Sequence, residues 1–204
     1  EAYEAFIYRT RSVPTRDNLH DLFNGVCWLR FLAIKRRLNA LQAEQISLMG
    51  VGATRGPVRD ALTLFDENAL LLSGPAALRQ ALQAHDWQAL FVHHRDLWAQ
   101  ARCVVFGHAL LEKLVQPYKS ITAHVLWVDG PGPAGLNDGA DPANSDDVLD
   151  GFLPGRLSPE YLGTKPFMPL PVLGLPGWCA GNEDPDFYQD RGVFRPRRIP
   201  HPLA

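Results

Sequence analysis

Cysteine, long apolar runs and an excess of one charge are all scarce or missing in this sequence of 204 residues. The three cysteines are widely spaced and form no C-x-x-C pair, which argues against a disulfide framework and a cysteine zinc site. No run of about 18 apolar residues occurs, so we expect no membrane-spanning helix. The 20 basic and 22 acidic side chains give a net charge of −2, which provides no general attraction to nucleic acid.

Several signature motifs are also missing. The sequence contains no P-loop and no G-x-S-x-G, so it does not support a nucleotide triphosphatase or an α/β-hydrolase. Cys27 lies in an apolar stretch and is expected to pack in the core. The cysteines are expected to be reduced thiols, and no signal-peptide pattern follows Glu1. Both features predict a cytoplasmic protein of a bacterial type of cell. A targeting signal upstream of Glu1 would lie outside this sequence.

Length and composition predict one α+β domain over residues 1–204, mostly helical with a few short strands. Residues 3–14 fit either a strand or a short helix. A helix is predicted over residues 33–49 with Gly50 as its stop. Four polar side chains of this helix are expected to face water: Lys35, Arg36, Arg37 and Glu44.

The segment ALTLFDENALLLS predicts a hairpin, with strands at residues 61–65 and 69–73 and a turn at Asp66, Glu67 and Asn68. A helix is then expected to open at Pro75.

A long helical pattern covers residues 87–115, and two alternatives stay open there. Either Gly107 breaks the helix into two, or the sequence CVVF forms a short intervening strand. Residues 120–129 predict a strand. Residues 130–147 are rich in Gly, Pro, Asn and Asp, which predicts a flexible loop, and residues 165–204 predict an extended proline-rich segment packed on the domain. Four apolar side chains are expected to anchor that segment: Phe167, Leu170, Leu173 and Trp178.

Five short blocks along the chain carry a family resemblance: PTRDNLHDLFN, RDALTLFDEN, GHALLEKL, YKSITAH and PLPVLGLPGW. They resemble the signature segments of an uncharacterised proteobacterial domain-of-unknown-function family, and the resemblance runs from Tyr3 to about Phe194. It implies membership of that family but no particular activity, cofactor or partner, because the family has no settled function.

The first candidate site is the pair His20 and Asp21, with an amide side chain nearby at Asn24. A histidine beside a carboxylate can supply a base and a metal ligand on one turn. A divalent ion bound there would suit phosphodiester hydrolysis, because the ion stabilises the leaving oxygen. The segment from His20 to Asn39 also resembles the histidine–metal finger nucleases, which implies His20 as a base and Asn39 as a metal ligand.

A structural alternative exists for the same segment. Asp17 or Asn18 can cap a helix that starts near Leu19, with His20 bonded inside the fold.

The second candidate site is His108 with Glu112, four residues later and therefore on the same helix face. In the predicted strand, Thr122 and His124 share a face. If that strand lies beside the helix, His108, Glu112 and His124 would form a metal site with open positions. Lys119 lies in the same block. Alternatively, His108 is a buried histidine held by a carboxylate and His124 faces solvent.

Two further segments are weaker candidates. Arg59 and Asp60 could meet the carboxylates of the predicted turn, although such turns are usually only solvated. Residues 182–188 could fold over a pocket as a lid, or anchor the C-terminal segment through Phe187 and Tyr188.

Two functions therefore stay open. The first is a metal-dependent hydrolase, acting on phosphodiesters in the manner of a nuclease, with a divalent metal as cofactor and a small molecule or nucleic acid as substrate. Its candidate catalytic side chains are His20, Asp21, Asn24 and Lys119, and its candidate metal ligands are His108, Glu112 and His124. The second is a non-catalytic binding protein in which these groups form a structural hydrogen-bond network. Neither function involves a membrane.

Overall fold

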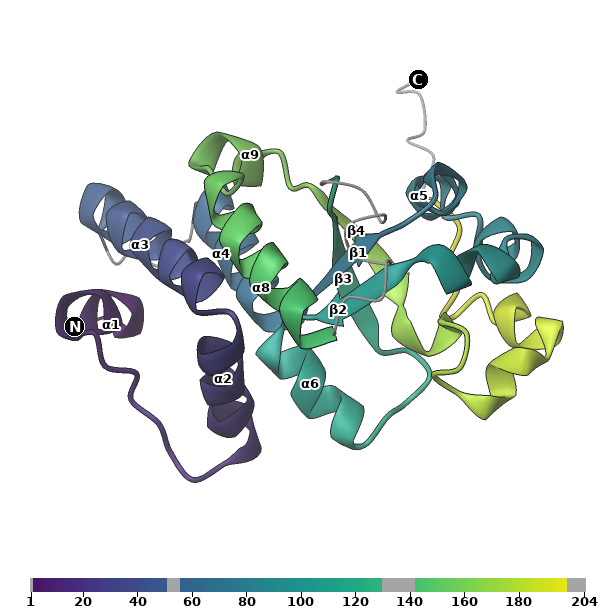
Figure 1. Ribbon diagram of the computed structural model, residues 1–204, viewed down its shortest axis with the longest axis horizontal. Coiled ribbons are helices and arrows are strands. Elements are labelled where there is room, and N and C mark those ends of the chain that lie inside the picture. The colour runs from purple at the N-terminus through teal and green to yellow at the C-terminus, as the bar shows by residue number, and fades with distance from the viewer. Residues whose placement is uncertain (1, 51–55, 130–141, 198–204) are drawn as a thin grey trace, which may run out of the picture.

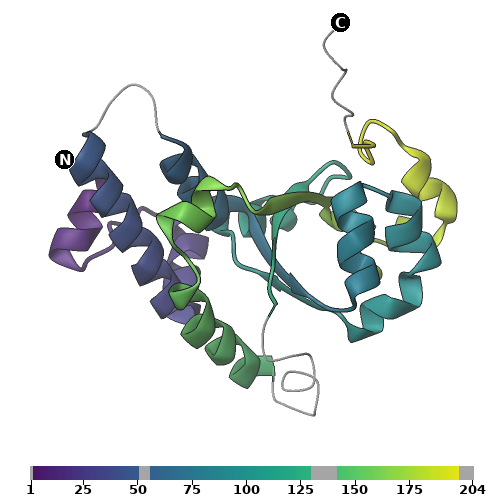
Figure 2. The same cartoon turned by 90° about the horizontal axis from the view of Figure 1, so that it is seen from above.

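The computed structural model describes residues 2–50, 56–129 and 142–197. In these residues a four-stranded sheet is covered by helices on one face and by helices and short turns on the other (Figure 1 and Figure 2). The chain is therefore an α+β domain, as the sequence predicts.

Four helices come first along the chain, and strands and helices are interspersed after them. The helices of the first part are α1 (Tyr3–Thr10), α2 (Leu19–Arg30), α3 (Leu32–Met49) and α4 (Pro57–Asn68). The middle of the chain forms β1 (Ala69–Ser73), α5 (Ala76–Ala84), β2 (Arg102–Val105), α6 (His108–Val115) and β3 (Thr122–Trp127). The last part forms α8 (Pro142–Phe152), α9 (Pro159–Gly163) and β4 (Phe167–Pro171).

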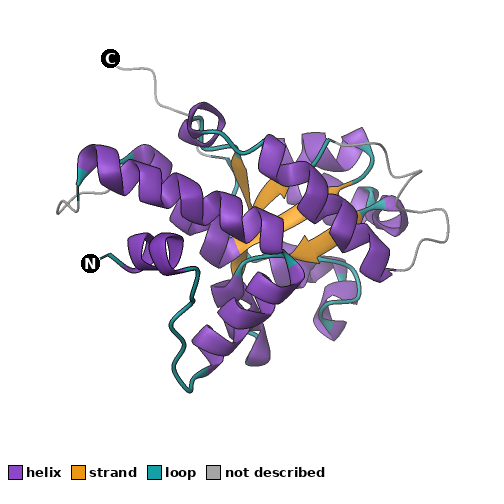
Figure 3. Ribbon diagram, turned by 60° about the vertical axis from the view of Figure 1, so that its left-hand side comes forward, coloured by secondary structure: helices purple, strands orange, loops and turns teal. Residues whose placement is uncertain are grey.

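The strand order is β2-β1-β3-β4, with β1 and β3 parallel and the two outer pairs antiparallel. Alternation along β1 divides the core into two. Leu70 and Leu72 belong to a cluster with α5 and the C-terminal segment, whereas Ala69 and Leu71 belong to a cluster with α3, α4, α8 and α9. The sheet consequently lies between two apolar layers. Figure 3 shows the strands among the helices from another side.

The predicted hairpin is wrong, because residues 57–68 form helix α4. Pro57 occupies the first helical position, and Ala61, Leu62 and Phe65 share a buried helix face at three- and four-residue spacing. Only β1 is a strand in this segment, and it pairs with β2 and β3 instead of with its predicted partner.

The region 87–115 is not one helix. A π-turn at Ala89–His93 and a 3-10 turn at Arg95–Gln100 lead into strand β2, so the alternative with an intervening strand is confirmed. Residues 3–14, for which a strand and a short helix both fit the sequence, contain helix α1.

The predicted flexible loop over 130–147 is wrong in its last part, since α8 begins at Pro142, while residues 130–141 lie outside the described residues. Asp146 and Leu149 of this helix are buried, together with Leu153 in the 3-10 turn that follows it, and composition alone does not reveal this pattern. Arg102 donates to the Asp146 carboxylate over 2.6 Å, and Arg30 pairs with it as well.

The C-terminal segment packs on the domain as predicted, but its first part is edge strand β4 and not only an extended covering. Leu170 and Leu173 are buried anchors, whereas Trp178 is 38% exposed and is not one. Residues 198–204 lie outside the described residues. Within the described part of the chain, no helix combines the length and the apolar character that crossing a bilayer requires.

Candidate functional site

Helix α2 begins at Leu19 because Asn18 caps it: the Asn18 side-chain oxygen accepts a hydrogen bond from the Asp21 backbone N–H over 2.8 Å. The cap orients the first turn and directs His20 toward α6. The Asp21 carboxylate accepts from the Arg16 backbone N–H over 2.6 Å and from Arg16 Nε over 3.1 Å. These bonds to Arg16 lower the pKa of Asp21. Asp21 therefore ties the preceding segment to α2.

His108 opens helix α6 at a very close approach between backbones. A Cβ on the preceding Gly107 would lie 2.4 Å from the Glu67 carbonyl oxygen and 2.6 Å from the Ala69 nitrogen. This contact brings His108 Nδ1 to 2.8 Å from the Asp66 backbone oxygen. His108 is 5% exposed, and burial lowers the pKa of its imidazole. Glycine at 107 is therefore what allows His108 to reach the end of α4.

The two histidines meet where α2 packs on α6. His20 Nε2 and His108 Nε2 are 3.1 Å apart, and the rings are close to perpendicular, with an interplanar angle of 78°. The other nitrogen of His20, Nδ1, lies 2.9 Å from a carboxylate oxygen of Glu112, one turn after His108 on α6. Three groups separated by up to 92 positions in the sequence therefore form one chain of contacts.

The partners of the two Nδ1 atoms fix where the hydrogens lie. A backbone carbonyl and a carboxylate can only accept, so both His108 Nδ1 and His20 Nδ1 carry a hydrogen. A neutral imidazole has a single N–H, so each Nε2 atom is then an acceptor. Two acceptors 3.1 Å apart repel each other unless a proton or another cation lies between them. The arrangement is therefore a site for one positive charge.

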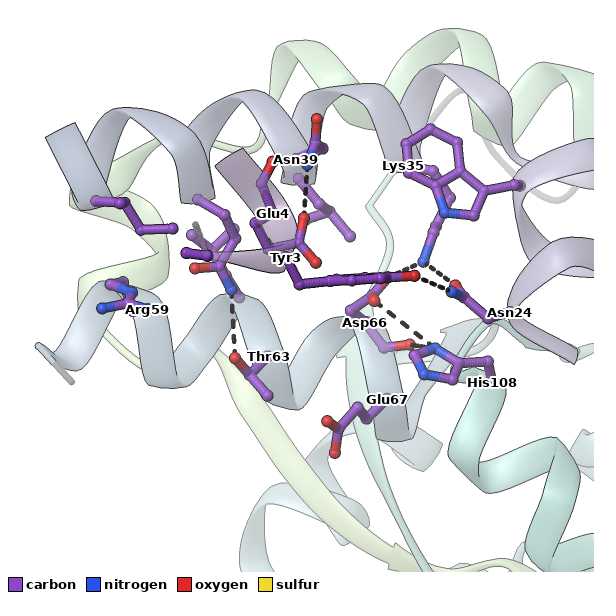
Figure 4. A pocket seen from close by; sticks show the side chains of 16 residues that line it. Tyr3, Glu4, Asn24, Lys35, Asn39, Arg59, Thr63, Asp66, Glu67 and His108 are labelled. Carbon is purple, nitrogen blue, oxygen red and sulfur yellow. Dashed lines mark hydrogen bonds and ion pairs between the residues drawn. The ribbon is translucent and has the colours of Figure 1, made fainter. Parts of the chain in front are cut away.

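A cavity of about 350 Å³, with both polar and apolar side chains in its lining, adjoins His108 and is bounded by α1, α2, α3 and α4 (Figure 4). At the His108 end, the ammonium group of Lys35 lies 2.5 Å from an Asp66 carboxylate oxygen and donates to Asn24 Oδ1 over 2.8 Å. The Lys35 side chain is only 3% exposed. The Asn24 amide in turn donates to the Tyr3 hydroxyl over 3.3 Å.

Further along the cavity, Asn39 donates to the Glu4 carboxylate over 2.6 Å and Gln42 donates to the Thr63 hydroxyl over 3.2 Å. Burial raises the pKa of Glu4 and that of Tyr3. The cavity is thus lined by polar groups that largely satisfy one another while remaining at its surface.

The structure brings together some of the predicted site residues and separates others. His20, His108 and Glu112 are in contact, and Asn24 lies in the adjoining cavity. His124 lies on β3 opposite Ala69 and Pro169, half-buried, and no described hydrogen bond or ion pair links it to the other two histidines.

Lys119 pairs instead with Asp190 of the C-terminal segment, over 3.1 Å, and lies against the Phe187 ring. Asn39 bonds to Glu4 and not to a site shared with His20. Among the described residues, no group of three or more His, Cys, Asp or Glu side chains is placed to hold a metal ion, so His108, Glu112 and His124 do not assemble as a triad.

The weaker candidates also have defined positions. Arg59 and Asp66 line the cavity from one face of α4, whereas Asp60 is exposed. Residues 180–189 form two 3-10 turns in which Tyr188 is buried in the aromatic cluster under the C-terminal segment, the anchoring alternative. Cys27 is buried, and burial raises its pKa to about 11, which makes it a poor nucleophile.

Sequence reasoning missed Lys35, which it assigned to solvent, and the carboxylate of Asp66 that partners it. One signal was available: Lys35 follows Phe31 and Ile34 and precedes Leu38 and Asn39, so it lies next to the buried stripe of α3.

Residues 1–198 of the chain match one family model, which is described as a protein of unknown function (DUF3025). The chain belongs to this family, as the five sequence blocks predict. No curated protein and no solved structure matches it.

Proposed function

We propose that this protein is a metal-dependent hydrolase in which His20 and His108 hold one divalent ion. The observation that carries the proposal is the pair of converging Nε2 atoms, each with its Nδ1 atom bonded to an acceptor. Metal-binding histidines commonly donate their second N–H to a carboxylate or a backbone carbonyl, the two partners present at this site. Two ring nitrogens bound to one tetrahedral zinc ion lie roughly 3.3–3.4 Å apart, close to the 3.1 Å separation of the two Nε2 atoms.

In this proposal the ligand set differs from the one the sequence suggests. His20 and His108 are the ligands, and Glu112 orients His20 instead of binding the ion. Two protein ligands leave positions for a water molecule and for a substrate group. A bound divalent ion lowers the pKa of such a water toward about 7 and stabilises a leaving oxygen, as phosphodiester hydrolysis requires. The cavity beside His108, at about 350 Å³, suits a small molecule better than a polymer.

The first test is metal content and metal affinity. Tag-free protein will bind zinc or manganese at one ion per chain in calorimetry, and His20→Ala or His108→Ala will abolish that binding. Glu112→Gln will weaken it about 10- to 100-fold, because the orientation of His20 is lost. His93→Ala is the matched control, since His93 is exposed and lies outside the site. Equal metal binding by all four variants and the parent protein, or no binding by the parent, refutes the proposal.

A second candidate is the non-catalytic binding protein, and the absence of a third ligand among the described residues favours it. In that case one proton, not a metal ion, lies between the two Nε2 atoms, and the polar groups serve stability. His108→Ala would then lower the melting temperature equally with and without a chelator, because it leaves the Asp66 carbonyl unsatisfied.

We also propose a cytoplasmic location. Cys27, Cys103 and Cys179 are all unpaired in the structure, as thiols in a reducing compartment would be. Fractionation of cells that express the full-length protein, followed by detection with an antibody, tests this directly. Recovery in a periplasmic or membrane fraction would contradict it.

A further inference from the structure

The cavity has a second end, away from the histidines, where Arg59 lies (Figure 4). Arg59 and Asp66 are seven positions apart on α4, so they are about 10 Å apart along the helix axis. Figure 4 shows the same separation of ends, with Arg59 at one side and Asn24 and His108 at the other. A ligand that touches both ends must therefore be elongated.

The charges along the cavity are not matched at the Arg59 end. Three carboxylates line the cavity, at Glu4, Asp66 and Glu67. Asp66 is paired with Lys35, and Glu67 lies eight positions beyond Arg59, about 12 Å along the axis. Glu4 accepts from Asn39, and burial raises its pKa, which favours its neutral form. None of the three is an ion-pair partner of Arg59 within the described residues.

Arg59 also has an unsatisfied donor. Its Nε atom is buried and has no hydrogen-bond partner in the described structure. That atom has almost no accessible surface, so a ligand in the cavity would meet the terminal guanidinium nitrogens instead. These are parallel donors that match the two oxygens of a carboxylate or a phosphate. Leu38, Leu62 and Ile46 also line the cavity and provide apolar contact for the body of a ligand.

We propose that the cavity binds an elongated small molecule by a terminal anionic group, a carboxylate or phosphate, at Arg59. The assignment of the other end as the reacting end rests on the function proposed for His20 and His108. The anion subsite itself does not, because Arg59 lies about 10 Å from Asp66 along α4.

The experiment measures anion binding directly. Hexanoate and hexyl phosphate, with hexanamide as the neutral analogue, are titrated into the chelator-treated protein and followed by amide chemical shifts. We expect saturable binding of at least one anion and a dissociation constant at least tenfold higher in Arg59→Met. Arg59→Lys will recover part of the lost affinity. The relative affinity of the two anions then shows whether the group is carboxylate or phosphate. Arg36→Met, which removes an exposed cation from the neighbouring helix, will bind as the parent does.

Two further measurements separate this inference from the proposed function. His20→Ala will retain anion binding, and Arg59→Met will retain metal binding, because each substitution leaves the other end of the cavity intact. Equal affinity for hexanoate, hexyl phosphate and hexanamide, no saturable binding of either anion, or unchanged anion affinity in Arg59→Met overturns the anion subsite. If the parent protein binds the anion but no metal ion, only the proposed function is overturned.

Discussion

The buried ion pair between Lys35 and Asp66 gives a prediction about stability with a definite asymmetry. The two charged groups are 2.5 Å apart, but the Lys35 side chain is 3% exposed whereas that of Asp66 is 22% exposed. Asp66→Asn leaves a buried ammonium group without its counter-charge, and Lys35→Met leaves a carboxylate that water can still reach. The aspartate substitution will therefore destabilise the protein more than the lysine substitution.

The magnitudes follow from the same burial. Removing one partner of a buried pair costs about 3–5 kcal/mol, and the Asn side chain still accepts one hydrogen bond, so we expect about 3 kcal/mol for Asp66→Asn. Lys35→Met removes the donor to Asn24 Oδ1 and costs about 1–2 kcal/mol, in the range for an orphaned polar partner. The double variant removes both charges and will be less destabilised than the sum by about 1–2 kcal/mol.

Urea unfolding followed by circular dichroism measures these differences. With a slope of about 2–3 kcal/mol per molar urea, the loss in Asp66→Asn corresponds to a shift of the midpoint by about 1 M. Arg36→Met is the control, because Arg36 is exposed on the same helix as Lys35. Additive losses in the double variant, or a larger loss in Lys35→Met than in Asp66→Asn, would refute the burial reasoning.

Four more substitutions test other features. Burial lowers the pKa of His124, with a contribution from Lys113, so the unfolded chain binds a proton more readily than the folded chain. Stability therefore falls as the pH drops below about 6.5. His124→Gln will make that fall in stability shallower in thermal melts, and an unchanged pH profile would contradict this. Gly107→Ala will destabilise by about 3 kcal/mol through its backbone clash, whereas Gly25→Ala, with open space in the middle of α2, will stabilise by about 0.5–1 kcal/mol in urea unfolding. Asn18→Ala will cost about 1 kcal/mol in the same assay by removing the cap of α2, and no loss would show that the cap is dispensable.

The parts of the fold that were predictable are those that local chemistry determines. Gly50 ends α3 with a positive φ of 72°, and Asn18 caps α2. The end of α3 and the start of α2 can therefore be predicted from the sequence. The strand over residues 122–127 also follows from β-branched and apolar alternation. In residues 57–68, by contrast, the turn-like residues Asp66 to Asn68 suggested a hairpin and outweighed Pro57, the true helix-start signal.

The site was half predictable for the same reason. The spacing of His108 and Glu112 places both on one helix face, and both contact His20 in the structure. His20 joins these two residues because α2 packs against α6. This contact spans 88 positions of the sequence, so no local sequence pattern predicts it. The burial of Lys35 likewise depends on Asp66, which is 31 positions away.

The spacing of the two Nε2 atoms depends on how α2 is held, and the fold holds it at both ends. At its start, Asp21 binds the backbone and side chain of Arg16. At its end, one non-helical residue, Phe31, separates α2 from α3, and the Asp150 carboxylate accepts from two backbone N–H groups in the first turn of α3, each over 2.8 Å. Since Asp150 belongs to α8, three separate segments fix the position of His20 relative to α6. A rigid support of this kind would keep the two ligands of the proposed metal site in a fixed geometry.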